Sequence, residues 1–186
     1  MRNLVKTLTV GALVGCFSGG LSYAADDAVA TFTTKASQKV VRAGEQFTVD
    51  VGLVNVTDLG ALQFMMKATG GTQGTLTVIG IEMNKERSDY VFGTASAMDA
   101  VDRQQMRAGA VLMDGSRSFD SASVATVTLQ ASKDATGTFQ VNVAEGPETF
   151  LRKFDASPMF AAIGKDVTIT VSNRMESQRP HKRKGR

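Results

Sequence analysis

The sequence contains very few of the residues that build disulfides, metal centres and nucleophilic active sites. Its 186 residues include no tryptophan, one cysteine and one histidine. A lone cysteine cannot close an internal disulfide, and no group of cysteines and histidines is present to hold a structural zinc. A nucleophile activated by histidine would depend on His181, which lies in a highly charged terminal segment. We therefore expect no disulfide scaffold, zinc domain or histidine-dependent hydrolase.

Carboxylates are the remaining candidates for catalysis. A glycosidase needs two of them across a substrate cleft, but acidic residues three apart are also typical of solvated loops. The sequence offers three such pairs, which are Glu86/Asp89, Asp99/Asp102 and Glu145/Glu148. No phosphate-binding glycine loop or dinucleotide motif accompanies them. The sequence therefore predicts a non-catalytic protein without catalytic residues.

Three aspartates lie in segments that read as turns, namely Asp114, Asp120 and Asp134. Their carboxylates are the hard oxygen ligands that calcium prefers, but the alternating acidic spacing of a dedicated calcium loop is absent. Aspartate is common in turns because its side chain bonds the nearby backbone. We predict no metal site and no cofactor in this chain, so calcium would enter only through a bound partner.

The first 24 residues have the features of an export signal. Arg2 and Lys6 are followed by an uncharged, largely apolar stretch that ends at Leu21. Small residues flank Tyr23, as signal peptidase requires, which predicts cleavage after Ala24. The apolar stretch is short and rich in glycine for a transmembrane helix. The segment 1–24 is therefore predicted to be a signal peptide that is removed.

A second interpretation of the same segment stays open. The run Leu13-Val14-Gly15-Cys16 resembles a bacterial lipobox, in which the cysteine is lipidated and becomes the first residue. Cleavage after Ala24 would yield a soluble protein, whereas modification of Cys16 would yield a lipoprotein. Either outcome places the protein outside the cytoplasm, as a secreted, periplasmic or cell-surface protein.

Charge is unevenly distributed along the chain. The formal net charge of the whole chain is +3, but residues 174–186 alone hold six basic residues and one acidic residue. The segment 173–186 has no apolar period and is predicted to be a disordered basic tail. It is either a solvated end or an attachment to an anionic envelope surface. Because no aromatic residue interleaves the basic run, we expect no nucleic-acid partner.

Residues 25–172 are dominated by alternation of apolar and polar side chains. Clear examples are Phe47–Leu53, Leu62–Ala68, Ala125–Ser132, Phe139–Val143 and Val167–Val171. This period of two predicts antiparallel strands with one buried face and one wet face. Near Leu53–Val56 the apolar phase shifts by one residue, which predicts a bulge.

Turn-forming clusters separate these runs. They are Arg42–Glu45, Thr57–Gly60, Thr69–Gly71, Asp114–Gly115 and Asp134–Gly137. Glycine, asparagine and aspartate supply the positive φ angles and local hydrogen bonds that such turns need. Strands and turns at this spacing predict an all-β fold, a two-sheet antiparallel sandwich. The polar stretch Met83–Gln104 breaks the pattern, and we interpret it as a long loop, with a helical turn over Ala97–Gln105.

The order of these segments resembles that of cohesin domains. Val41–Val51 resembles the opening "AGD.VTV.V" of the family, and Asn55–Phe64 resembles its "NV..LGA.QF" segment. Further matches follow in the family's order, at Leu76–Glu82, Met106–Gly115, Ser123–Leu129, Ala135–Thr138 and Val167–Val171. The resemblance implies a jelly-roll sandwich of about nine strands, related to carbohydrate-binding modules. It spans about residues 28–172.

The resemblance also implies a function. Cohesins are scaffolding or attachment modules that bind a protein partner, often in polysaccharide catabolism, through one sheet face. The matching positions here are Ala61, Gln63, Met65, Lys67, Asp114 and Ser116. Met65 between Gln63 and Lys67 suits a binding surface, although a loop or sheet edge could equally cover it. At Ala61 and Gln63 the family tends to carry asparagine or aspartate, so the partner here need not be a cellulosomal dockerin.

Two alternative functions stay open beside a protein-binding module. A carbohydrate-binding module would usually display coplanar aromatic rings, which a chain without tryptophan is poorly equipped to form. A structural accessory of an envelope or secretion assembly would use the basic tail as its anchor.

The intact mass of the exported protein tests the two interpretations of the leader. We expect mass spectrometry to find a chain that begins at Ala25 and carries no lipid. A chain that begins at Cys16 with acyl groups attached would instead establish the lipoprotein.

Overall fold

The computed structural model describes residues 29–102 and 106–172, and these residues form strands, turns and loops without a helix. Accordingly, this part of the chain holds no helix that is long and apolar enough to cross a membrane. The strands are β1 (Thr31–Ala36), β2 (Val40–Arg42), β3 (Gln46–Gly70), β4 (Leu76–Met83), β5 (Ala97–Asp102), β6 (Arg107–Leu112), β7 (Arg117–Ala131), β8 (Gly137–Val143), β9 (Phe150–Lys153), β10 (Pro158–Met159), β11 (Ala162–Ile163) and β12 (Val167–Ser172).

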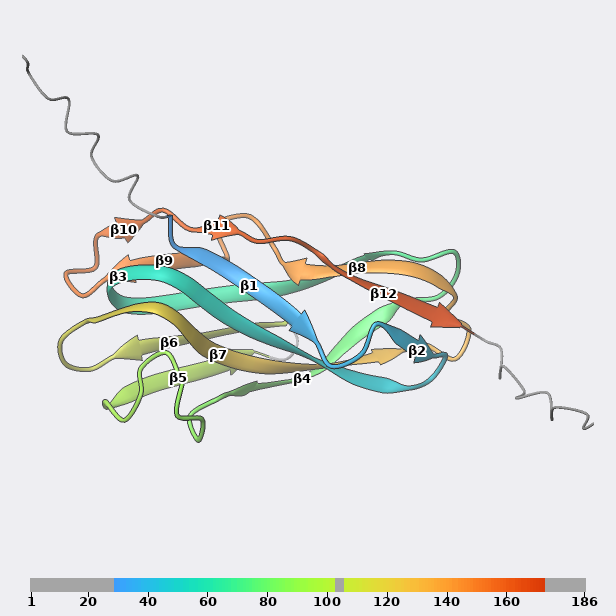
Figure 1. Cartoon of the computed structure of the whole chain (residues 1–186), viewed down its shortest axis with the longest axis horizontal. Helices are drawn as coiled ribbons and strands as arrows, with labels where there is room; N and C mark the ends of the chain where they lie inside the picture. Colours follow the sequence, from blue (N-terminus) through green and yellow to red (C-terminus); the bar gives the residue numbers. More distant parts are fainter. Residues whose placement is uncertain (1–28, 103–105, 173–186) are drawn as a thin grey trace, which may run out of the picture.

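The strands form two packed layers that share β3 (Figure 1). In the first layer the N-terminal half of β3 lies between β1 and β7, and β4 pairs with the far side of β7. In the second layer the C-terminal half of β3 lies between β6 on one side and β8 and β9 on the other. The second layer continues through β5 at one edge and through β12 and β2 at the other. The predicted all-β sandwich is confirmed.

The turn predicted at Thr57–Gly60 is wrong, because the structure has a bend within β3 at this place. The strand continues through this segment, and its register with β7 shifts between Val56 and Leu59. Asn55 and Asp58 adopt positive φ angles of 56° and 64°, a conformation that asparagine and aspartate tolerate better than most residues. The polar cluster therefore makes a bulge that redirects one strand from the first layer to the second, instead of a turn between two strands.

The other turn predictions agree with the structure. Chain reversals follow β2, β3, β6 and β7, and glycines with positive φ lie at Gly44, Gly70, Gly71, Gly115 and Gly137. Gly60 serves a different purpose, because a side chain there would overlap the backbone of Phe154 at the end of β9. Its lack of a Cβ allows β9 to run close beside the bend of β3.

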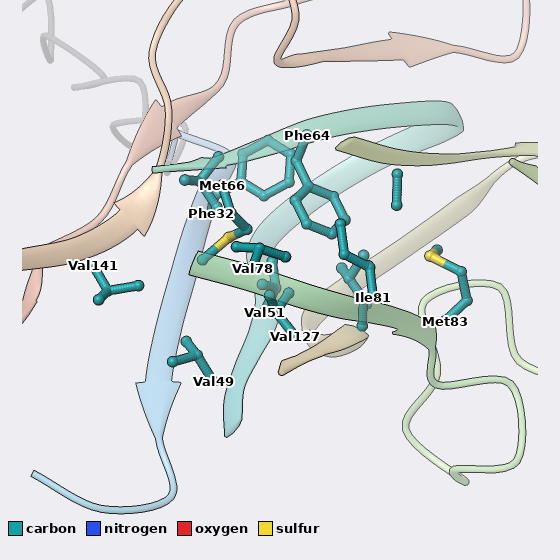
Figure 2. Close-up of a cluster of buried hydrophobic side chains, with 14 of the residues drawn as sticks. Phe32, Val49, Val51, Phe64, Met66, Val78, Ile81, Met83, Val127 and Val141 are labelled. Carbon is teal, nitrogen blue, oxygen red and sulfur yellow. The ribbon is translucent and has the colours of Figure 1, made fainter. Parts of the chain in front are cut away.

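The core lies between the two layers and is built from the alternating apolar positions (Figure 2). Val49 and Val51 from the first half of β3 are buried, as are Phe64 and Met66 from its second half. The rings of Phe32 and Phe64 lie 6.3 Å apart and join β1 to the second layer. A single strand thus contributes apolar side chains to both walls of one core, so burial of this core stabilises the bend.

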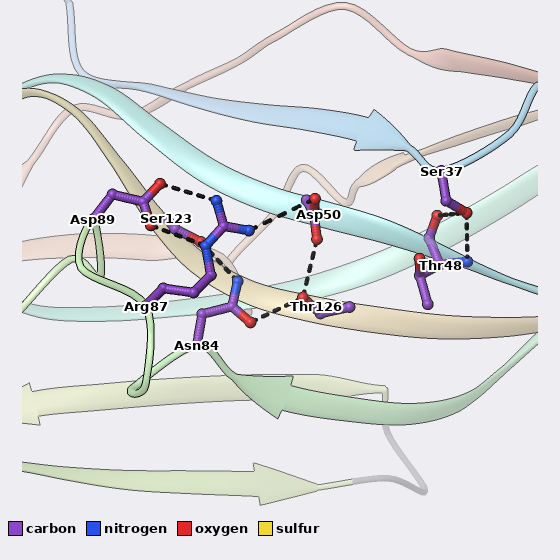
Figure 3. A network of polar contacts seen from close by, with 8 residues as sticks. All are labelled: Ser37, Thr48, Asp50, Asn84, Arg87, Asp89, Ser123 and Thr126. Carbon is purple, nitrogen blue, oxygen red and sulfur yellow. Dashed lines mark hydrogen bonds and ion pairs between the residues drawn. The ribbon is translucent and has the colours of Figure 1, made fainter.

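The stretch Met83–Gln104 contains the clearest correction. Residues Ala97–Asp102 form the edge strand β5, which pairs with β6 along its length, where a helical turn was expected. The loop before it is held against β7, where the Asn84 side chain donates to Ser123 Oγ (2.7 Å) and lies 2.8 Å from the Thr126 hydroxyl. Thr126 also contacts Asp50 of β3 (Figure 3). The loop therefore borders β7, with Tyr90 and Phe92 in the core, while the Asn84 side chain reaches Thr126 on the outward side of the first layer.

An arginine and an aspartate fix the tip of the same loop. Arg87 Nε donates to Asp89 Oδ1 (2.9 Å), and this bond from the guanidinium lowers the pKa of the Asp89 carboxyl. The backbone N–H of Ser123 donates to the Asp89 carbonyl (2.7 Å), and that of Val91 donates to the Ser123 carbonyl (2.7 Å). The loop is therefore tied to β7 through its backbone, which limits how far it can move.

The predicted leader 1–24 and basic tail 173–186 lie outside the described residues. The boundaries of the domain at 25 and 172 therefore stay predictions, as do Cys16 lipidation and cleavage after Ala24.

Tyr90 provides a test of how this loop is packed. Its side chain is 5% exposed and its hydroxyl has no hydrogen-bond partner among the described residues. Burial, with a smaller contribution from Asp99, raises the pKa of Tyr90 from 10.0 to about 12. Because the unfolded chain ionises first, the free energy of unfolding should fall as the pH rises from 10 to 12.

Tyr90→Phe is the control for this pH dependence, since it removes the titrating group and keeps the ring. We expect the free energy of unfolding of wild type, measured with urea from pH 8 to 12, to fall above pH 10 relative to that of the variant. At pH 8 the variant should be as stable as wild type or about 1 kcal/mol more stable, because an unpaired buried hydroxyl is lost. A marked loss of stability at pH 8 would show that the hydroxyl has a partner.

Candidate functional site

The outward face of β5, β6 and the second half of β3 is the best candidate for a binding surface. Residues that pair directly across antiparallel strands point to the same side. One row across β5, β6 and β3 consists of Met98, Val111 and Ala61. The next row consists of Ala100, Gly109 and Gln63. These rows run across the strands on the side away from the core. We call this surface, together with β9 at its far edge, the β5–β6–β3 face.

A shallow groove crosses the β5–β6–β3 face. It has a volume of about 400 Å³. Its lining residues are Leu62, Gln63, Met98–Asp102, Arg107–Val111 and Phe150. Gly109 and Ala100 make its low point because they carry little or no side chain, and a Cβ on Gly109 would lie 2.8 Å from the Leu62 carbonyl. The tight pairing of β6 with β3 therefore both requires glycine and creates the groove.

Large apolar side chains stand beside this groove in contact with solvent. Met98 is 65% exposed, Val111 51% and Met113 52%. Ala108, Ala110 and Leu112 on the opposite side of β6 are buried, so strand alternation alone places Val111 and Met113 outside. Apolar groups gathered on one face, with an adaptable methionine among them, are typical of protein interaction sites.

Charged and polar groups border the apolar part. The loop between β8 and β9 brings Glu148 over the face, where Arg107 donates to its carboxylate (2.7 Å) and the Gln63 amide donates to its backbone carbonyl (2.9 Å). The guanidinium carbon of Arg152 lies 5.3 Å from the centre of the Phe150 ring. An apolar centre with a polar border resembles the composition of known protein interfaces.

The sequence-predicted site residues are partly brought together. Ala61, Gln63 and Met65 share the outward side of β3, and Ala61 and Gln63 lie in the rows described above. Met65 is half-buried, and its N–H donates to Thr149 Oγ1 of the neighbouring loop, so that loop covers it in part.

The other three predicted residues lie at the ends of the face. Lys67 pairs with Asn142 of β8, whereas Asp114 and Ser116 follow β6 in an exposed turn. Six residues of strand, about 20 Å, separate Lys67 from Ala61, which lies beside Val111 at the other end. Lys67 and the Asp114–Ser116 turn therefore cannot act on one small ligand, though a protein partner could span both.

Sequence reasoning missed the residues that shape the groove. Met98 lies in the segment that was expected to be helical, and Gly109 carries no chemistry that a motif search detects. Val111 offered a usable signal, because it is out of phase with the buried positions of its strand.

One member of each acidic pair considered for catalysis is held by a basic side chain. Asp89 is bound by Arg87, Asp99 by Lys85 and Glu148 by Arg107. No three histidine, cysteine or acidic residues come together as a metal site within 29–102 and 106–172. Asp134 accepts a hydrogen bond from the Ser132 hydroxyl (2.6 Å), which is the turn chemistry expected of it.

Comparison with known proteins identifies the fold. No protein-family model matches the sequence, and no curated protein matches it significantly. The seventh ScaB type I cohesin from Pseudobacteroides cellulosolvens superposes with a TM-score of 0.55 at 14% identity, covering 82% of this chain and 98% of that one. A non-cellulosomal cohesin from Archaeoglobus fulgidus superposes with a TM-score of 0.53 at 13% identity, covering 82% of this chain and 99% of that one.

A third solved structure agrees with these two. The sixth cohesin of Acetivibrio cellulolyticus scaffoldin B, solved in complex with a Cel5 dockerin mutant, gives a TM-score of 0.50 at 12% identity, covering 77% of this chain and 98% of that one. At such low identities the likeness concerns the fold. The chain has a cohesin-like fold, as its sequence resemblance implied.

Glu148 allows a test of what holds the β5–β6–β3 face. Its ion pair with Arg107 is partly exposed, with side-chain exposures of 46% and 32%. We expect Glu148→Ala to lower the unfolding free energy by less than about 1 kcal/mol, because pairs in contact with water contribute little. Urea unfolding measures this, and Arg107→Ala, which also removes the ion pair with Asp102 (3.6 Å), should lower the free energy of unfolding somewhat more. A loss above about 2 kcal/mol would show that the pair is a structural requirement of the fold.

Proposed function

We propose that this domain is a non-catalytic interaction module that binds a protein partner on the β5–β6–β3 face. The observation that carries the proposal is the groove of about 400 Å³ with Met98 and Val111 exposed at its side. Removing these apolar groups from water would stabilise a complex. The flanking Arg107 and Gln63 would add directional contacts.

The opposite surface of the sandwich is less suited to this role. There the loop that contains Asn84 and Arg87 packs over β7 and hydrogen-bonds with Ser123 and Thr126 (Figure 3). A partner would have to displace that loop or bind polar groups that already have partners. On the β5–β6–β3 face Met98 and Val111 are open to solvent, so a partner can contact these apolar groups without displacing a loop.

A folded protein is the first partner class to test. One similar cohesin was solved with a dockerin, which supports this choice through likeness of fold alone. A role in polysaccharide catabolism would be a further step of the same proposal. Export through the leader is likewise proposed, and the partner is then sought among exported proteins.

Partner capture by charge-introducing variants tests the proposal. The chain is immobilised and exposed to the secretome of its source, with and without calcium, and captured proteins are identified by mass spectrometry. We expect Val111→Glu to reduce capture of the specific partner at least tenfold, because a carboxylate would be buried in the complex. Lys67→Glu and Asp114→Lys should each reduce it less.

Val40→Glu is the matched control. Val40 is 64% exposed on β2, at the other edge of the second layer from β5. The same substitution there should leave capture within twofold of wild type, while urea unfolding verifies that both variants remain folded. The proposed face would be contradicted if Val111→Glu and Val40→Glu reduced capture equally, or if neither variant reduced it.

A further inference from the structure

A second and larger cleft lies at one end of the sandwich. It forms where β3 bends, beside the beginnings of β1 and β7 and the turn between β9 and β10, which Figure 1 shows together at one end of the molecule. Its volume is about 1020 Å³, at the upper end of the range of small-molecule sites. Its lining residues are Ala30, Asn55, Val56, Thr57, Ser118, Phe119, Asp120, Lys153, Pro158, Met159 and Phe160. We call it the end cleft.

The end cleft has an apolar floor. Ala30 and Val56 are buried, and Phe119 and Met159 are half-buried beside them. These side chains pack against the core and fix the shape of the floor. A ligand that enters the cleft therefore meets a preformed apolar surface that need not reorganise on binding.

The rim of the end cleft carries polar groups that form no hydrogen bond or ion pair among the described residues. The side chains of Asn55, Thr57, Asp120 and Lys153 are exposed, and none forms a hydrogen bond or ion pair within residues 29–102 and 106–172. Ser118 differs, because its Oγ accepts a bond from the Asp58 N–H (2.9 Å). Asn55, Thr57 and Asp120 thus line the cleft without a competing hydrogen bond or ion pair, while Lys153 interacts only through space with the Asp155 carboxylate.

The backbone at this rim adopts an uncommon conformation. Asn55 and Asp58 have positive φ angles of 56° and 64°, on either side of Val56 and Thr57. Left-handed conformations are uncommon outside glycine, although asparagine and aspartate tolerate them. Here the bulge turns Asn55 and Thr57 toward the cleft while Val56 stays in its floor.

An aromatic ring projects at the mouth of the end cleft. Phe160 is 78% exposed, the largest exposure among the big apolar side chains of the described residues. Nothing in the fold is stabilised by leaving this ring in water, and a ligand that stacks on it would bury it.

We propose that the end cleft binds a neutral carbohydrate. Sugars combine an apolar C–H face, which would stack on the Phe160 ring, with hydroxyls that would bond to the Asn55 amide and the Asp120 carboxylate. Asp120 and Lys153 carry opposite charges, so the lining residues have no net charge that would favour an anion or a cation. This site is separate from the β5–β6–β3 face, so a glycan and a protein could be bound together.

Binding to oligosaccharides tests the proposal on the full chain. An array of neutral and charged oligosaccharides of two to six units is screened first, and the strongest neutral ligand is then titrated by calorimetry. We expect Phe160→Ala and Asp120→Ala each to raise its Kd at least tenfold. Both side chains are exposed, so we expect the variants to unfold at the same urea concentration as wild type.

Phe154→Ala is the matched control. Phe154 is 50% exposed in the turn between β9 and β10, whereas Phe160 follows β10, and Phe154 does not line the end cleft. This variant should therefore bind the sugar with a Kd within twofold of wild type. Val111→Glu should also bind the sugar normally, which separates failure of this proposal from failure of the proposed protein partner.

Three results would overturn the proposal. One is an array without a neutral ligand, and another is an equal loss of binding in Phe154→Ala and Phe160→Ala. The third is that the protein sediments with vesicles of phosphatidylethanolamine and phosphatidylglycerol, and that both Phe154→Ala and Phe160→Ala abolish this. The two rings would then contact a lipid surface instead of a sugar.

Discussion

The structure depends on one strand that pairs in both layers. β3 runs from Gln46 to Gly70 and contributes core side chains from both of its halves. The chain has to bend sharply between the halves without losing its backbone hydrogen bonds, since unpaired buried backbone groups are costly. Asn55 and Asp58 supply the conformations that make this possible. Gly60 makes room for the turn after β9.

Both candidate binding sites follow from this bend. Its C-terminal side presents the outward row of β3 next to β6, where Gly109 leaves a groove beside Met98 and Val111. The bend itself lines the end cleft with Asn55, Val56 and Thr57, where the register between β3 and the start of β7 shifts. The two sites differ in chemistry, since the first is an apolar surface with a polar border and the second has unpaired polar groups over an apolar floor. A module with both could hold a protein and a glycan at once.

Local sequence patterns predicted most of the fold because strand alternation and turn chemistry are local properties. Phe64 and Met66 were assigned to the buried side of their strand, and Gln63 and Met65 to the other side. The polar cluster at Thr57–Gly60 was misread because a bulge and a turn use the same residues. Ala97–Asp102 was misread because an edge strand need not alternate, so pairing with β6 decides its conformation.

The sequence alone determined that this is a cysteine-poor β-sandwich, because periodicity and turn residues encode strands directly, and the order of its segments resembled that of cohesins. Tertiary structure alone decided which surfaces stay open. Met98 is exposed because β5 forms the edge of its layer. Glu148 lies over Gln63 because the loop between β8 and β9 passes beside β3. Phe160 projects into solvent beside the end cleft. Such features arise from segments far apart in the chain, and no local pattern records them.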